Sequence, residues 1–347
     1  MGKQDGELVV GREYPREGED ELVAEMVRQM KDQMEQLYRD TRTLRQVHSK
    51  MHGCVKAEFT VMPDLPDELK VGVFKEPKTF PAWIRFSNGN TKIQADKKID
   101  TRGAAIKLMN VPGKKLLYGE KEDQTQDFVL AASKIFFAKD LRDFHGLMTA
   151  SMSTDKWVIR RFFVSHLKIA FRTLTKILIH CKHPFALSYN SLSPYRFGDE
   201  SKAVRYMMLP SAGNVLEYTG ESDFNYLRQN MVATLAKNDI YFDFGVQFQT
   251  DAVNMPIEDG TVEWKSPFIK LAAIRIPRQV FDTPPQVESG ENLTYNVWHS
   301  IAEHKPLGGF NRGRLKLYKE MYEFRLKKNI VEQAEPVAGP DFFNNLI

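Results

Sequence analysis

Cysteine and long apolar runs are both scarce in this sequence. Its two cysteines, Cys54 and Cys181, argue against a disulfide-stapled scaffold and against a zinc site built from cysteine pairs. No run of about 18 uncharged apolar residues occurs, so we expect no membrane-spanning helix. The opening Met1–Pro15 is polar and has no apolar stretch typical of a signal peptide, which favours a reducing cytoplasm.

Several motifs of common enzymes are missing as well. There is no GxGxxG that opens a βαβ unit, no Walker A loop, no HExxH and no GxSxG. Nucleotide chemistry and serine-triad hydrolysis are therefore disfavoured. Lysine and arginine number 49 against 45 aspartates and glutamates, and a net charge of +4 gives no reason to expect nucleic acid.

The 347 residues have the composition of an ordinary soluble globular protein, with 42% hydrophobic and 27% charged residues. The 23 phenylalanines indicate an aromatic-rich interior or pocket. Short apolar or alternating segments, bounded by Pro, Gly, Asn or Asp, predict about eight strands. The nine candidate segments lie at residues 56–61, 70–74, 82–87, 104–108, 128–130, 135–137, 205–209, 241–248 and 269–276. This pattern predicts an α+β fold, an eight-stranded antiparallel β-barrel with surrounding helices.

Three helical regions accompany the strands. From about Asp20 to Arg45, apolar residues recur at spacings of three and four, which predicts an amphipathic helix. A helical block follows from Asp140 to about His183, and a basic helix from about Phe310 to Asn329. Within the block, Lys156–His183 contains seven lysines and arginines and no acid. Such a segment is typical of a surface helix, and peripheral membrane contact or fatty-acid entry stays open as the alternative.

The last helix places an arginine, a tyrosine and a second arginine in one stripe. At about 100° per residue, Arg314, Tyr318 and Arg325 point in directions within roughly 40° of one another. An arginine one turn before a tyrosine favours the phenolate, because a nearby opposite charge stabilises the charged form. Tyrosinate is a known axial ligand of haem iron, and arginine can bind a haem propionate. The alternative is an amphipathic helix in which the arginines and the tyrosine pack by stacking.

Five short motifs in order extend this observation. They are Arg45-x-Val47-His48-x-Lys50, Arg85-Phe86-Ser87, Arg102-Gly103-x-Ala105-x-Lys107, Asp127-x-Val129 followed by Phe136-Phe137, and Arg314-x-x-x-Tyr318. The ordered set resembles the haem catalases, over roughly residues 40–330 and only loosely from about 150 to 265. The chain is shorter than ordinary catalases. It is therefore similar to the small catalase-related haem proteins, which include peroxidases and allene-oxide-synthase-like fatty-acid hydroperoxide enzymes.

On the distal side, the resemblance assigns a catalytic pair and three pocket residues. His48 matches the distal histidine of the family, and Ser87 matches the serine that hydrogen-bonds this histidine. Val47 precedes the histidine as in true catalases. Phe136 and Phe144 match aromatic residues of the distal pocket.

On the proximal side, the resemblance implies haem b bound through an iron–tyrosinate bond. Tyr318 matches the axial ligand and therefore the metal-binding residue, and Arg314 matches its partner. Arg45, Arg85 and Arg325 match arginines that bind the haem propionates.

This sequence departs from the family at the distal asparagine. Counting back from the Phe-Phe pair puts that asparagine at Ala131 and its neighbour at Ala132, and Ser133 is a candidate substitute. Tyr322 is the rival axial ligand, but it lacks an arginine four residues earlier, so we expect Tyr318 to be the ligand.

The sequence therefore predicts a loose N-terminal arm at residues 1–18, a single catalase-like haem domain at 19–330 with a helical insertion at about 140–200, and a C-terminal tail at 331–347. The expected activity is that of a haem hydroperoxidase, peroxidase-like with weak catalase activity, acting on hydrogen peroxide or lipid hydroperoxides. The alternatives are a fatty-acid hydroperoxide isomerase, dehydratase or lyase, and a haem-binding protein without turnover. Assembly into a homo-oligomer stays open.

Overall fold

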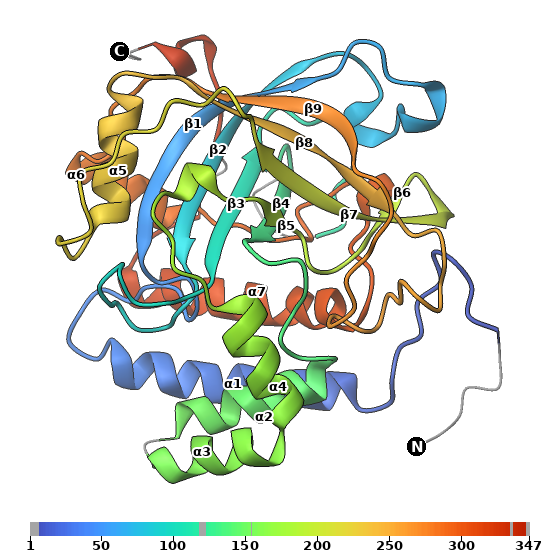
Figure 1. Cartoon of the computed structure of the whole chain (residues 1–347), viewed down its shortest axis with the longest axis vertical. Helices are drawn as coiled ribbons and strands as arrows, with labels where there is room; N and C mark the ends of the chain where they lie inside the picture. Colours follow the sequence, from blue (N-terminus) through green and yellow to red (C-terminus); the bar gives the residue numbers. More distant parts are fainter. Residues whose placement is uncertain (1–6, 118–122, 154, 334–335, 345–347) are drawn as a thin grey trace.

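Eight antiparallel strands close into a β-barrel (Figure 1). The computed structural model describes residues 7–117, 123–153, 155–333 and 336–344. The ring consists of β1 (Met51–Val61), β2 (Thr79–Asn88), β3 (Arg102–Leu108), β4 (Gln126–Ala131), β5 (Tyr189–Asn190), β7 (Asp199–Pro210), β8 (Ile240–Phe248) and β9 (Ile269–Ile276). Its order is β5-β4-β3-β2-β1-β9-β8-β7, and pairing of β5 with β7 closes it; β6 (Tyr195–Phe197) pairs with β7. The predicted fold class is therefore confirmed.

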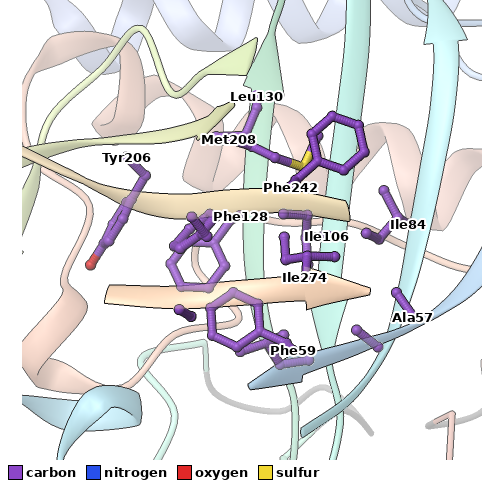
Figure 2. Close-up of a cluster of buried hydrophobic side chains, with 14 of the residues drawn as sticks. Ala57, Phe59, Ile84, Ile106, Phe128, Leu130, Tyr206, Met208, Phe242 and Ile274 are labelled. Carbon is purple, nitrogen blue, oxygen red and sulfur yellow. The ribbon is translucent and has the colours of Figure 1, made fainter. Parts of the chain in front are cut away.

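The barrel interior is filled by large side chains. Every second residue of a strand points inward, so β1 contributes Ala57 and Phe59 and β4 contributes Phe128 and Leu130 (Figure 2). The ring centroids of Phe59 and Phe244 lie 5.0 Å apart in an edge-on arrangement, and those of Phe128 and Phe244 also lie 5.0 Å apart. The aromatic-rich interior expected from the phenylalanine content is present.

A layer of three helices covers one side of the barrel. In Figure 1, α7 (Gly309–Asn329) runs beneath the barrel, and α1 (Glu19–Leu37) and α2 (Leu141–Met152) lie beyond it. Buried side chains of these three helices form a second apolar cluster, which includes Met26, Met30 and Leu317. The remaining helices are α3 (Lys156–Ser165), α4 (Leu167–Arg172), which continues as a π-turn (Thr173–Ile177), α5 (Tyr226–Leu235) and α6 (Pro284–Asn292).

Local sequence signals mark where several helices begin. The Asp140 side chain accepts hydrogen bonds from the amides of Arg142 and Asp143 at the start of α2, and Asp155 caps α3 in the same way. At α6, Thr283 and Gln286 form a capping box. Among the described residues, no helix is both long and apolar enough to cross a membrane.

Three local predictions are wrong. Residues 70–74 contain a 3-10 turn (Gly72–Phe74) rather than a strand, because Gly72 adopts a left-handed conformation with φ of 54°. Residues 135–137 form an irregular segment whose Phe136 amide donates to the carbonyl of Gly260 rather than to a neighbouring strand. The first helix ends at Leu37 instead of continuing to Arg45.

The N-terminal segment is irregular over its described residues but is bound to the domain. Glu13 forms an ion pair of 2.8 Å with Arg312 at the start of α7, and the Gly11 amide donates to the Gln249 side chain at 2.8 Å. Residues 1–6 of the expected arm lie outside the described residues. In the expected insertion, α4 and its continuation end at residue 177, and a segment with one 3-10 turn (Pro184–Ala186) then leads to β5.

Candidate functional site

A cavity of about 320 Å³ lies between the barrel wall and helices α1, α2 and α7. It is lined by residues that are far apart in the sequence, from Met30 in α1 to Arg325 in α7. All ten residues selected from the sequence line this cavity: Arg45, Val47, His48, Arg85, Ser87, Phe136, Phe144, Arg314, Tyr318 and Arg325. Because these residues are far apart along the chain, it is the fold that brings them together in one cavity.

His48 is held in an unusual backbone conformation at the barrel end. Its φ is 58°, in the left-handed region that few residues other than glycine adopt. The His48 amide donates to the carbonyl of Gly89 at 3.2 Å, and the His48 carbonyl accepts from Arg85 at 2.9 Å. These bonds fix the backbone, and a hydrogen bond of 3.0 Å between Nδ1 and the hydroxyl of Ser87 fixes the ring.

A glycine makes room for this ring. A Cβ atom at Gly103 of β3 would lie 2.6 Å from both Cε1 and Nδ1 of His48. The glycine of the third motif thus allows the imidazole to lie directly against β3.

The surroundings keep His48 neutral. Burial lowers its pKa to about 3, and the positive charges of Arg85, Arg45 and Arg314 act in the same direction. A neutral imidazole that donates its Nδ1–H to the Ser87 hydroxyl has the second ring nitrogen, Nε2, available as a proton acceptor.

Tyr318 and Arg314 lie one turn apart on α7, as their spacing predicts. The guanidinium carbon of Arg314 is 5.9 Å from the ring centroid of Tyr318. Arg314 donates to the side chain of Asn311 at 2.9 Å, so its charge is fixed beside the phenol ring. The rival residue Tyr322 also lines the cavity, with Arg325 5.4 Å from its ring centroid. The choice of Tyr318 over Tyr322 stays a prediction.

Three arginines contact one buried glutamate, two of them at its carboxylate and one at its backbone carbonyl. Arg45 Nη1 lies 2.7 Å from Oε2 of Glu291, and Arg85 Nη2 lies 3.3 Å from its Oε1. Arg325 donates to the backbone carbonyl of Glu291. Burial raises the pKa of Glu291, but the three arginines outweigh burial and lower it overall. Burial lowers the pKa of Arg325 to about 10, although Glu291 opposes this shift.

The cluster keeps an excess of positive charge. Three guanidinium groups and one carboxylate leave a charge of about +2 by formal counting. Within the described chain, the buried Nε of Arg85 has no hydrogen-bond partner. A porphyrin with two ionised propionates carries the matching charge of about −2, and Tyr318 offers an oxygen ligand in the same cavity. The donor set therefore fits haem.

Sequence reasoning missed Glu291. It lies near the end of α6, and a Cβ atom at the preceding Gly290 would come within 2.6 Å of Cβ of Cys54 in β1. This close approach brings Glu291 to the arginines. A small residue before an acid near a helix end is too common a pattern to have identified it from sequence.

The aromatic residues expected on the distal side form a group of neighbouring rings. The ring centroids of Phe136 and Phe137 are 4.2 Å apart, and Phe136 and Phe144 are 5.7 Å apart. Phe310, at the start of α7, lies 4.6 Å from Phe136 and also lines the cavity. Phe137 and Phe310 were not selected from the sequence: Phe137 belongs to the fourth motif but was not assigned to the pocket, and Phe310 lies outside all five motifs.

The position expected for a distal asparagine is apolar. Ala131 lines the cavity at the end of β4 and pairs in register with Gly103. Ser133 also lines the cavity, but its hydroxyl donates to the carbonyl of Ile135 at 2.7 Å. The candidate substitute is therefore engaged with its own loop.

Comparison with known proteins places the fold. A scan against protein-family models and a search of curated proteins gave no match. Catalase A from Saccharomyces cerevisiae matches with a TM-score of 0.64 at 17% identity, over 99% of this chain and 70% of that one. A fungal catalase matches with a TM-score of 0.62 at 16% identity, over 94% of this chain and 67% of that one. A bacterial catalase matches with a TM-score of 0.62 at 14% identity, over 93% of this chain and 64% of that one. The chain thus has a catalase-like fold, and it spans about two thirds of the length of these catalases.

Proposed function

We propose that this protein is a haem b hydroperoxidase that acts on organic hydroperoxides and, more weakly, on hydrogen peroxide. The observation that carries the proposal is that one cavity is lined by three sets of side chains. They are a neutral histidine hydrogen-bonded to a serine, a tyrosine beside a fixed arginine, and a cluster of three arginines. The order of the five motifs and the catalase-like fold also support this proposal.

The cofactor would be held from two sides of the cavity. Tyr318 would bind the iron as a phenolate, because the positive charge of Arg314 near its ring favours the anion. Arg45, Arg85 and Arg325 would bind the propionates through charge-assisted hydrogen bonds. When bound, the haem supplies two electrons for heterolytic cleavage of the peroxide O–O bond.

His48 would move the proton in this reaction. With Nδ1–H donating to Ser87, Nε2 accepts the proton from the near peroxide oxygen and passes it to the far oxygen. The far oxygen then leaves as water or, from an organic hydroperoxide, as an alcohol. A second peroxide or an organic donor returns the two electrons.

The apolar cavity favours an organic substrate. Ala131 offers no hydrogen-bond donor, and the phenylalanine group contributes apolar surface that suits an alkyl chain. Rearrangement of a fatty-acid hydroperoxide, by an isomerase, dehydratase or lyase, uses the same cavity and is the second candidate.

The test begins with the absorption spectrum of protein supplied with haem. A Soret band followed by a spectral change on adding peroxide is expected, and absence of the band contradicts the proposal. Three assays then separate the activities: oxygen release from hydrogen peroxide, oxidation of an organic donor, and loss of the conjugated diene of a lipid hydroperoxide. Diene loss without a donor identifies rearrangement, and haem binding without turnover identifies a non-catalytic haem protein. Sedimentation of the loaded protein measures its assembly.

A further inference from the structure

The helical hairpin α3–α4 exposes an unusual number of large apolar side chains. Six of them lie between residues 157 and 174: Trp157, Val158, Val164, Leu167, Phe171 and Leu174. Trp157, Leu167 and Phe171 are 71%, 69% and 67% exposed. Single exposed apolar residues are normal on a protein surface, but a contiguous apolar patch marks an interaction site. We name these six residues the hairpin face.

The spacing of these residues in the sequence follows the period of a helix face. In α4 and its π-turn, Leu167, Phe171 and Leu174 follow the i, i+4, i+7 pattern of one helical face. Ile169, on the opposite side of the same helix, is buried. In α3, Phe162 lies against Gly146 of α2. Each helix therefore packs one side on the domain. Trp157 and Val164, seven residues apart in α3, share an exposed side of that helix, and Val158 lies about 100° away from Trp157.

Positive charge surrounds the hairpin face. Lys156, Arg160, Arg161 and Lys168 are exposed, and no acidic residue occurs between Lys156 and His183. Within the described chain, none of these four cations forms a salt bridge with a carboxylate. Arg160 lies 5.0 Å from the ring centroid of Trp157, so a cation lies directly beside an exposed apolar ring.

We propose that the hairpin face docks this protein on an anionic lipid bilayer. Apolar side chains can enter the boundary between headgroups and acyl chains, while lysine and arginine pair with lipid phosphates. A two-fold contact between two copies would bring the same cations against one another, and like charges disfavour that contact. The charge of the surface therefore favours lipid over a second copy of this chain.

The hairpin face is connected with the cavity described above. Arg172 in α4 donates to the backbone carbonyl of Phe137 at 3.2 Å, and both Phe137 and Ile177 of the π-turn line the cavity. Docking would thus bring the cavity wall near the membrane, where a hydroperoxide on an acyl chain is found. That consequence rests on the proposed function, whereas docking itself requires no haem.

The test measures binding of the full chain to phosphatidylcholine vesicles with and without phosphatidylglycerol. We expect binding to the anionic vesicles, weakening as salt is raised, and a blue shift of tryptophan fluorescence. Trp157 is the tryptophan that should report the shift, because Trp264 and Trp298 are buried. Trp83 is half-buried in β2 against Phe342, outside the hairpin. The measurement is independent of haem, so its failure and the failure of the proposed function are distinguishable.

Two sets of variants test whether the hairpin face is the surface that binds the vesicles. Phe171→Glu should lower vesicle binding about tenfold or more, since it removes a large inserted side chain. Val253→Glu is the matched control, because Val253 is 68% exposed and lies outside the hairpin. Arg160→Gln with Arg161→Gln should lower binding about 25-fold, at about fivefold for each cation. Circular dichroism checks that each variant is folded.

Three results would overturn the proposal. They are no binding of the folded wild-type chain to anionic vesicles at low salt, equal loss of binding in the Phe171 and Val253 variants, and a dimer that Phe171→Glu converts to a monomer without any vesicle binding. The last result would make the hairpin face an interface between copies.

Discussion

Arg45 and Glu291 form a buried ion pair of 2.7 Å at the centre of the arginine cluster. The partners come from opposite ends of the domain, one just before β1 and one near the end of α6. Arg85 links this pair to His48, because its Nη2 donates to the His48 carbonyl at 2.9 Å and lies 3.3 Å from Glu291. The cationic end of the cavity and His48 therefore share one guanidinium group.

The first prediction concerns Glu291→Gln. Removing this carboxylate leaves three neighbouring cations uncompensated, which should lower the free energy of unfolding of the haem-free protein by about 3–5 kcal/mol. The same change removes a competitor for the arginines, so haem should raise the melting temperature more than in the wild type. Thermal unfolding with and without haem measures both effects.

Glu288→Gln is the control for this prediction. Glu288 is 63% exposed and its carboxylate lies 3.4 Å from the exposed Arg42, and such a surface ion pair contributes little to stability. It should change neither quantity. A Glu291→Gln protein with wild-type stability and a wild-type haem response would exclude the charge-compensating role.

The second prediction concerns the axial ligand. Tyr318→Phe should lose the oxygen ligand and change the visible spectrum, while the three arginines still bind haem weakly. Turnover should vanish. Tyr322→Phe should keep the wild-type spectrum, and the opposite pattern in the two spectra would make Tyr322 the ligand.

The candidate site was largely predictable because its residues lie in short motifs at fixed offsets. Arg314 and Tyr318 share a helix face, and this local geometry follows from the sequence alone. Glu291 could not be found in this way, because its role arises only when α6 packs against β1. Phe310 reaches the cavity in the same manner, through the start of α7 against the irregular segment at Phe136.

The fold was predictable where strands are long and alternate cleanly. β8 and β9 were found close to their observed bounds. The two-residue strand β5 has no periodicity to detect, although it closes the barrel. Residues 70–74 alternate like a strand, but a left-handed glycine turns them into a 3-10 turn, so a local conformation overrides the pattern.

The third prediction concerns His48 and the glycine behind it. His48→Ala should bind haem normally and react about 10²–10⁴-fold more slowly with peroxide, the usual contribution of a general acid–base group. Gly103→Ala should also slow the reaction, because its Cβ would collide with the imidazole. Stopped-flow spectroscopy measures the rate with peroxide. A loss below about tenfold in His48→Ala would show that His48 is not the base.

The fourth prediction concerns acid stability. Burial lowers the pKa of His304 to about 3 and that of His183 to about 4, and one ring nitrogen of each accepts a backbone N–H, from Val73 and Phe185 respectively. Both pKa values lie below the unfolded value of about 6.5, so the unfolded chain takes up protons first as the pH falls.

The free energy of unfolding should therefore fall as the pH drops from about 6.5 to 5, by on the order of 1–2 kcal/mol for each histidine. Urea titrations at several pH values measure this slope. The variant His304→Gln should be less stable at pH 7 but should show a smaller slope. Stability that is constant from pH 7 to 5 would contradict the assignment.

The last prediction concerns Ala131, which pairs with Gly103 and therefore lies beside the strand position that supports His48. In the haem catalases, which this sequence resembles, an asparagine at the matching position donates a hydrogen bond to bound peroxide. A hydrogen bond to a charged group contributes on the order of 1.5–3 kcal/mol, or about ten- to a hundredfold in rate. Ala131→Asn should therefore raise oxygen release from hydrogen peroxide within that range.

A bulky hydroperoxide depends less on this contact, because the apolar cavity can position its chain. Ala131→Asn should therefore leave organic hydroperoxide turnover unchanged or lower it by crowding. Ala131→Leu, which adds bulk without a donor, is the matched control and should raise neither activity. An oxygen electrode and a donor-oxidation assay give the two rates. A wild-type protein that already releases oxygen as fast as ordinary catalases, or an asparagine variant without any gain, would show that the missing donor does not limit this site.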